Sequence, residues 1–282
     1  MSRKVLNTIV SVLIVLSGVI LFNYPSISTF VNNLTANREV VDYQNATSQM
    51  NDEELEQEMR TAEAYNRSLT SSFPADPFST GARSADLTGT GFEDFDMLQP
   101  GGAVCYLEIP RIDLYQLVRY GTDTEVLNTG IGLVENTSLP VGGTGTHAVL
   151  SAHTGMASRK LFTDLDKMQI GDMFFIHIRS NHLAYKVDQI KVVLPEETDD
   201  LLIMEDMDCV TLVTCTPFGI NDHRLLVRGT RTPWDFEKEG GSPVLQRRSR
   251  MKQWIAAFTA AGVFMVIVLV FVLRDLRKNR RK

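Results

Sequence analysis

Between residues 103 and 231, short apolar runs alternate with turn residues along the chain. The runs are rich in Val, Ile, Leu, Phe and Tyr, which favour strands. They cover residues 103–109, 112–119, 147–152, 173–179, 183–193, 209–215 and 223–231. One short helix is predicted at Lys160–Met168, ended by Gly171. Seven or eight short strands with little helix predict a closed barrel or a sandwich.

The residues before the strands divide into a helical zone and a loop. In residues 38–70, apolar side chains recur at near-helical spacing among many glutamates. Asn51, followed by three acidic residues, is a good helix start, because an N-cap side chain and first-turn carboxylates stabilise the free amide groups there. Residues 71–102 hold three prolines and several Gly, Ser and Thr residues, so they predict a loop.

Two longer apolar runs lie near the ends of the sequence. Val5–Phe22 follows Arg3 and Lys4, which fits either a cleaved signal peptide or an uncleaved signal-anchor. No small-X-small cleavage signal follows it, which favours the anchor. Trp254–Leu273 has 20 residues, of which only Thr259 is polar. A helix of that length spans about 30 Å, so this run predicts a transmembrane helix rather than a buried core helix.

Charge around the two runs predicts the orientation. Six cations occur in residues 274–282, and Arg3 and Lys4 precede the first run, so the positive-inside rule places both ends in the cytoplasm. Four cations within residues 247–252 oppose this assignment, although they can also sit against anionic lipid headgroups. The sequence therefore predicts a protein of the cell membrane, with lipid as one partner and residues 23–253 on the extracellular face.

Net charge argues against nucleic acid as a partner. Residues 1–22 carry +2 and residues 254–282 carry +5, so the chain's total of −6 leaves −13 for the exported part. An acidic domain repels a phosphate backbone. It is compatible with a substrate that carries lysine amines, but many exported proteins are acidic.

The chain has three cysteines, Cys105, Cys209 and Cys215. An odd count leaves at least one free thiol, and so few cysteines do not make a disulfide scaffold. Cys105 and Cys209 lie in apolar runs that favour packed thiols, while a disulfide between them stays open. The sequence contains no Cys-X-X-Cys, and His147 and His153 have no companion ligands nearby, so we expect no metal site and no cofactor.

Cys215 ends one strand-like run and Arg224 opens the next. If the residues between them connect an antiparallel hairpin, the thiol and the guanidinium face each other across strands about 4.8 Å apart. A fixed cation beside a thiol lowers its pKa and favours the reactive thiolate. Taken alone, the pair is more often a buried cysteine and a surface arginine.

A histidine favours the catalytic interpretation of Cys215 and Arg224. His153 ends the short apolar strand at residues 147–152, and Gly155 then turns the chain into a loop. A histidine at one strand end can reach a cysteine at another, whatever their separation in the sequence. The combination of His153, Cys215 and Arg224 predicts a catalytic cysteine with an acid–base partner and a cation.

These residues resemble the sortases, and among them class C, the sortases that polymerise pilins. The resemblance covers about residues 40–232 and rests on four segments in the expected order. They are Ser-Ala-His-Thr-Gly at 151–155, Lys-Leu-Phe-Thr-Asp-Leu-Asp at 160–166, Thr-Leu-Val-Thr-Cys at 211–215 and Asn-Asp-His-Arg-Leu-Leu-Val-Arg-Gly at 221–229. The resemblance implies a mainly β fold, a closed eight-stranded barrel, with His153, Cys215 and Arg224 as catalytic residues.

A second feature of class C lies in the loop. Pro-Ala-Asp-Pro-Phe-Ser at residues 74–79 is similar to the Asp-Pro-aromatic lid that covers the active site of pilin sortases. Asp76 could pair with Arg224 and the ring of Phe78 could cover the sulfur of Cys215, while Pro77 stiffens the segment. The alternative is an ordinary Asp-Pro turn. Many members have Trp or Tyr where this chain has Phe78.

The resemblance implies transpeptidation through a thioacyl enzyme. Cys215 would cleave a Leu-Pro-X-Thr-Gly-like sorting signal, and an acceptor lysine of another pilin subunit would resolve the intermediate as an isopeptide bond. A sortase that anchors proteins to peptidoglycan is the alternative with the same chemistry. A non-enzymatic β-domain on the membrane leaves His153, Cys215 and Arg224 unexplained.

The predicted organisation has seven parts. They are a signal-anchor or signal peptide at 1–22, a helical segment at 23–70, the lid loop at 71–102, the catalytic barrel at 103–232, a tether at 233–253, the transmembrane helix at 254–273 and a basic cytoplasmic tail at 274–282.

Overall fold

The computed structural model describes residues 3–69, 74–79, 87–99, 101–156 and 159–235, together with Gly262, Phe264 and Val268. The chain divides into two compact units. One contains residues 1–27 and 236–282, and the other contains residues 28–235. Among the described residues, all the strands and all the predicted site residues lie in the second unit.

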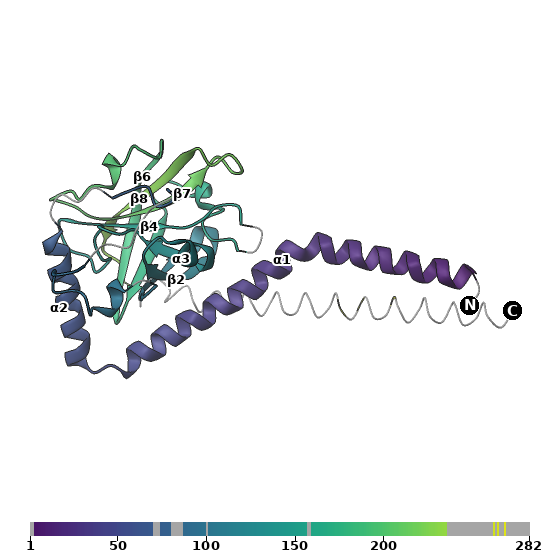
Figure 1. Cartoon of the computed structure of the whole chain (residues 1–282), viewed down its shortest axis with the longest axis horizontal. Coiled ribbons are helices and arrows are strands. Elements are labelled where there is room, and N and C mark those ends of the chain that lie inside the picture. The colour runs from purple at the N-terminus through teal and green to yellow at the C-terminus, as the bar shows by residue number, and fades with distance from the viewer. Residues whose placement is uncertain are drawn as a thin grey trace. The chain divides into compact units, whose positions relative to one another are not determined.

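Eight strands close into a barrel, in the order β1-β2-β3-β4-β7-β8-β6-β5 (Figure 1). The strands are β1 (Ala103–Ile109), β2 (Leu114–Tyr120), β3 (Ile131–Leu133), β4 (Thr146–Ser151), β5 (Met173–Ile178), β6 (Asn181–Val193), β7 (Asp208–Thr216) and β8 (His223–Thr232). The pairs β2–β3 and β4–β7 are parallel, and the other six are antiparallel. The predicted eight-stranded barrel is confirmed. Strand β3 was missed because three residues are too few to show an alternating pattern.

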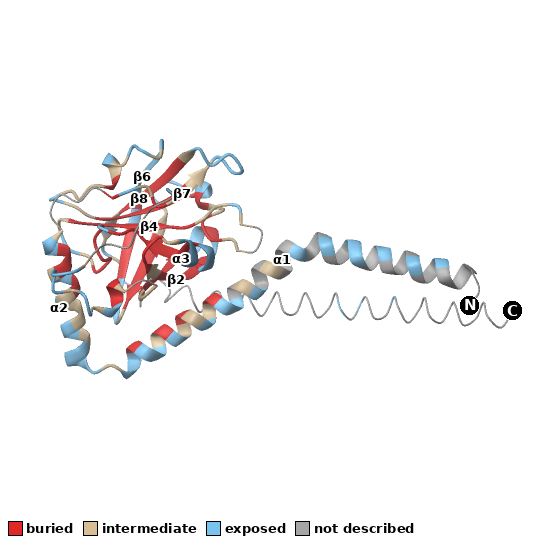
Figure 2. Cartoon of the chain, viewed as in Figure 1, coloured by how far each residue is buried: buried red, intermediate tan, exposed pale blue. Residues whose placement is uncertain are grey.

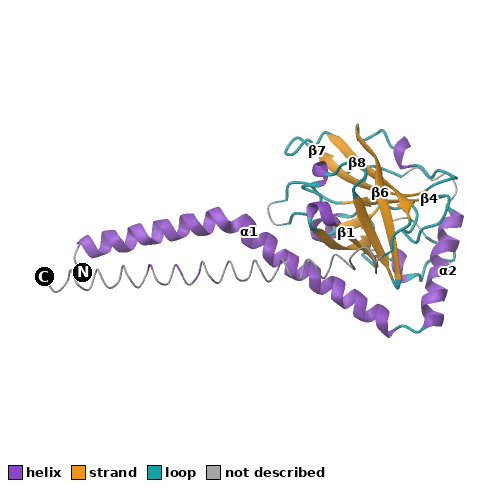
Figure 3. Ribbon diagram, turned by 180° about the vertical axis from the view of Figure 1, so that it is seen from behind, coloured by secondary structure: helices purple, strands orange, loops and turns teal. Residues whose placement is uncertain are grey.

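The helices are α1 (Arg3–Gln49), α2 (Asp52–Ser68) and α3 (Thr124–Thr129), with 3₁₀ turns η1 (Asp96–Leu98), η2 (Pro110–Ile112), η3 (Leu165–Lys167) and η4 (Asp199–Leu201) (Figure 3). As the sequence predicted, Asn51 is the N-cap of α2, and its side chain and that of Glu54 form a capping box. The predicted helix at 160–168 is wrong: only η3 forms there. Leu161 has a φ of 38°, in the left-handed region that an α-helix excludes.

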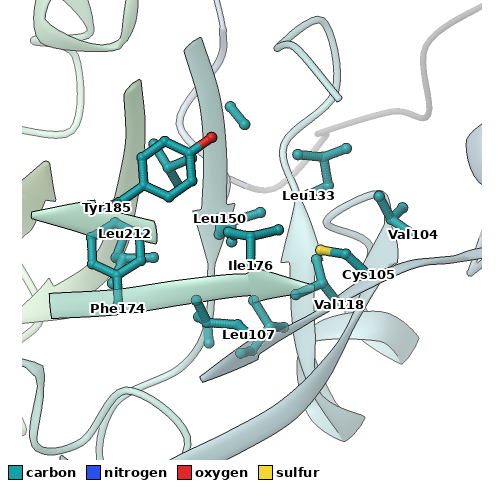
Figure 4. Close-up of a cluster of buried hydrophobic side chains, with 14 of the residues drawn as sticks. Val104, Cys105, Leu107, Val118, Leu133, Leu150, Phe174, Ile176, Tyr185 and Leu212 are labelled. Atoms are coloured by element: carbon teal, nitrogen blue, oxygen red, sulfur yellow. The ribbon is translucent and has the colours of Figure 1, made fainter. Parts of the chain in front are cut away.

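The barrel interior is filled by apolar side chains, among them Leu107, Leu133, Leu150, Phe174 and Leu212 (Figure 4). Figure 2 shows the strands mostly buried. Outside the interior, Tyr43 of α1 donates its hydroxyl hydrogen to the backbone oxygen of Val104 at 3.0 Å. Asn66 of α2 exchanges two hydrogen bonds with the backbone of Leu139. The C-terminal part of α1 and helix α2 are therefore fastened to the barrel.

All three cysteines are free, and Cys105 and Cys209 are buried. The disulfide that the sequence left open does not form: Cys105 belongs to the barrel core, whereas the thiol of Cys209 donates to the backbone oxygen of Thr146.

Residues 5–22 belong to α1, and the run at 254–273 falls outside the described residues except for Gly262, Phe264 and Val268. Within the part of the chain that the structure describes, no helix combines the length and the apolar character needed to cross a membrane. The predicted tail at 274–282 and most of the tether at 233–253 also lie outside the described residues.

Candidate active site

Three adjacent strands bring the predicted catalytic residues together. Cys215 of β7 is paired with Arg224 of β8, as the hairpin argument predicted. On the other side of β7, parallel strand β4 pairs Ser151 with Val213. The alignment continues beyond β4, where the amide of Ala152 donates to the oxygen of Val213 at 3.2 Å. His153 and Cys215 each lie two residues beyond the paired Ser151 and Val213, so they come side by side.

We call His153, Cys215 and Arg224 the active-site row. Its position follows from the alternation of side chains along each strand. Ala148 and Leu150 of β4, and Ala152 just after it, point into the barrel core, whereas Val149 belongs to a separate cluster on the outer face. This outer cluster consists of Val134, Val149, Leu201, Val213 and Leu226, with Phe78 and Val193 packed against it. The active-site row extends this outer face at the ends of β4 and β7.

Residues 74–79, the lid segment, lie over the row. The carboxylate of Asp76 accepts two hydrogen bonds from Arg224, from Nε at 2.7 Å and from Nη2 at 2.8 Å. The ring of Phe78 lies with its centroid 5.2 Å from the guanidinium carbon of Arg224 and 5.5 Å from the centroid of the His153 ring. Pro77 is buried. The lid segment thus contacts both neighbours of Cys215.

Arg224 is fully occupied in this closed arrangement. Its third nitrogen, Nη1, donates to the backbone oxygens of Asn221 and His223 at 3.1 and 3.0 Å. The residue is only 8% exposed. The bidentate hydrogen bonds to Asp76 raise the pKa of the guanidinium further, so its charge is permanent. A substrate oxygen can reach Nε and Nη2 only if Asp76 leaves.

Burial decides the ionisation of the other two residues. It raises the pKa of the Cys215 thiol, and although Arg224 opposes this shift, the carboxylate of Asp76 adds to it. Burial also lowers the pKa of His153. The sequence argument counted only the arginine and predicted a lowered cysteine pKa, which is wrong for the closed lid. With the lid closed, a neutral thiol and a neutral imidazole are favoured.

Two loops beside the row touch each other, a feature that the sequence analysis missed. Gly155 follows His153 with a φ of 74°, and its amide donates to Oγ1 of Thr163 at 3.1 Å. A methyl group at Gly155 would lie 2.7 Å from Cε2 of Phe218, which belongs to the β7–β8 loop. The ring of Phe218 is 69% exposed. The sequence shows a glycine two residues after His153 and a phenylalanine three residues after Cys215, but it carries no signal that these two loops meet.

Comparisons with known proteins agree with this site. The family model described as "Sortase domain" matches residues 107–232. Among solved structures, Sortase C of Streptococcus pneumoniae is 40% identical, with a TM-score of 0.63, and the match covers 70% of this chain and 97% of that one. The report of that structure concerns catalysis and pilin substrate specificity. Sortase C1 of Streptococcus agalactiae is 38% identical, with a TM-score of 0.63 and coverage of 71% and 96%.

Similarity to a curated relative is lower. Sortase D of Bacillus subtilis (strain 168) is 25% identical over 136 residues, which are 47% of this chain and 66% of that protein. The match therefore spans slightly less than two thirds of that relative's length.

Proposed function

Because this chain belongs to the sortase family and, by its likeness to solved sortase C structures, to class C, we propose that it is a cysteine transpeptidase that joins pilin subunits. The observation that carries the proposal is the active-site row, in which His153 just after β4 lies beside Cys215 of β7 and Arg224 of β8, beneath a lid segment anchored to Arg224.

The first half of the reaction is acyl transfer to Cys215. The thiolate attacks the threonine carbonyl carbon of a Leu-Pro-X-Thr-Gly-like sorting signal, and the developing oxyanion faces Nε and Nη2 of Arg224 once Asp76 has left. The carbon–nitrogen bond then breaks, and protonated His153 gives its proton to the departing glycine amine. A thioester on Cys215 and a neutral imidazole remain.

The second half is resolution by an amine. A lysine side chain of another pilin subunit attacks the thioester carbon, and neutral His153 takes a proton from the attacking nitrogen. The carbon–sulfur bond breaks, Cys215 leaves as the thiolate, and an isopeptide bond joins the two subunits. The first half starts from the ion pair of thiolate and imidazolium, and the second half restores it. The closed lid disfavours this ion pair, because burial raises the pKa of Cys215 and lowers that of His153.

The lid segment gives this enzyme a resting state. It occupies the two guanidinium nitrogens of Arg224 that face the oxyanion, and its carboxylate raises the thiol pKa. A sorting signal must displace it, so activity depends on an equilibrium between closed and open lids.

The proposal includes the location of the enzyme. The apolar runs at residues 5–22 and 254–273, with their flanking cations, hold it in the cell membrane. Residues 23–253 then lie on the extracellular face, where exported pilin subunits arrive.

The test uses the full chain in detergent, a substrate protein with a sorting signal, and two competing acceptors, a pilin lysine and a peptidoglycan stem-peptide amine. Mass spectrometry should find a thioacyl adduct on Cys215 and a threonine–lysine isopeptide in the product. Cys215→Ala should give neither, while the matched control Cys209→Ala, a buried thiol on the same strand, should give both. Products on the stem-peptide amine alone would identify a wall-anchoring sortase, and the absence of any adduct would refute the proposal.

A further inference from the structure

The side chain of Ser151 has no hydrogen-bond partner although it is fully buried. Its exposed fraction is 0%, and its hydroxyl makes no hydrogen bond within the described part of the chain. Buried hydroxyl groups in folded proteins are nearly always hydrogen-bonded, because burying one without a partner is unfavourable. Alanine at this position would avoid that cost in the closed structure, so the resting fold does not account for the hydroxyl.

Ser151 lies on the outer face of the barrel, in line with the active-site row. Along β4 it sits midway between Val149 and His153, and across the β4–β7 pair it is opposite Val213. Val149 and Val213 belong to the outer cluster against which Phe78 of the lid packs. The hydroxyl is therefore on the same face as the outer cluster against which the lid segment packs.

The distance between Ser151 and Cys215 follows from strand geometry. Ser151 is one strand away from Val213, and Val213 is two residues before Cys215. With about 4.8 Å between strands and about 3.3 Å per residue, Ser151 lies roughly 8 Å from Cys215. An extended peptide whose threonine carbonyl is at Cys215 places a backbone carbonyl about two residues upstream at that distance.

We infer that Ser151 is a substrate-positioning residue, whose hydroxyl donates a hydrogen bond to the sorting-signal backbone about two residues upstream of the cleaved bond. The inference rests on the proposed function. When the lid opens, the hydroxyl gains the partner that it lacks in the closed state. The bond recognises an extended peptide whatever its side chain, and it fixes which carbonyl lies at the thiol.

The test compares Ser151→Ala with its parent, the full chain carrying Asp76→Ala and Phe78→Ala so that the lid does not compete. A hydrogen bond formed equally in ground state and transition state should appear in KM alone. Its loss should raise KM for a Leu-Pro-X-Thr-Gly peptide about 3- to 10-fold, with kcat unchanged. Binding of the same peptide to the Cys215→Ala form should weaken by the same factor. Labelling of Cys215 by a small thiol reagent should not change.

Ser138→Ala is the matched control. Ser138 is also a fully buried serine, but its hydroxyl accepts a hydrogen bond from the amide of His147 at 3.1 Å. Its loss should lower the melting temperature and leave KM unchanged, whereas Ser151→Ala should leave the melting temperature unchanged or raise it.

An unchanged KM and peptide affinity in Ser151→Ala, with a parent that cleaves the peptide, would overturn the role of Ser151 and leave the proposed function standing. A lowered melting temperature with unchanged KM would assign Ser151 to the fold alone. A parent that neither binds nor cleaves the peptide would overturn the proposed function and this inference with it.

Discussion

Replacing Asp76 by asparagine separates the two effects of the closed lid, coverage and charge. Asparagine keeps the shape of the side chain and one acceptor oxygen, so one of the two hydrogen bonds from Arg224 can survive. The negative charge and the second acceptor are lost. The lid segment should therefore open more often, and the field on Cys215 should change.

The magnitude follows from the burial of the pair. Both side chains are 10% exposed, so the pair exceeds the roughly 1 kcal/mol of exposed salt bridges. A hydrogen bond to a charged group contributes about 1.5–3 kcal/mol. Losing one such bond should raise the open population about 10- to 100-fold, since 1.4 kcal/mol is a factor of ten.

The assay is the rate at which an uncharged methanethiosulfonate labels Cys215, measured against pH. The labelling rate of an uncharged reagent depends on the thiolate fraction of Cys215 and on access to the thiol. The altered charge at residue 76 neither attracts nor repels such a reagent. The labelling rate at the high-pH plateau should rise about 10- to 100-fold, in proportion to the open population. Asp76 raises the pKa of the thiol, so its neutralisation lowers that pKa and moves the labelling midpoint to lower pH.

Asp222→Asn is the control. Its exposed carboxylate lies 2.7 Å from Nδ1 of His223, next to Arg224 in the sequence, and it pairs with that imidazole instead of the guanidinium. It should change neither the plateau nor the midpoint. The melting temperature of Asp76→Asn should fall little, because an open lid lets water solvate Arg224. An Asp76→Asn protein with the labelling rate and midpoint of the wild type would refute the reasoning.

Four further outcomes are expected. Cys215→Ala should abolish transpeptidation of a sorting peptide, yet lower the free energy of unfolding by only about 1–2 kcal/mol, as chemical denaturation would measure. His153→Ala should slow peptide turnover about 10²–10⁴-fold, and a loss below tenfold would show that His153 does not transfer the proton. Arg224→Lys should lose most of kcat, because an ammonium cannot replace two parallel donors; full activity would mean that charge alone suffices. Gly229→Ala should lower the melting temperature strongly, since the added methyl would lie 2.5 Å from Cε1 of Phe174 in the barrel core; an unchanged melting temperature would show that Phe174 moves aside without cost.

Short apolar runs separated by turn residues were enough to predict most strands, and the N-cap pattern at Asn51 predicted the start of α2. Both signals depend on neighbours in the sequence. The antiparallel pairing of Cys215 with Arg224 was equally local, since one short connection joins their strands. Where local pattern and local conformation disagreed, as at Leu161, the prediction failed.

Other features required the tertiary structure. His153 comes beside Cys215 because β4 and β7 pair in parallel, and nothing local in the sequence specifies which distant strands become neighbours. The raised pKa of Cys215 depends on burial and on Asp76, which reaches Arg224 from 148 residues away. The unpartnered hydroxyl of Ser151 is visible only once every neighbour is in place. The sequence determined which side chains could do the chemistry, and packing between distant segments decided their contacts and their charge.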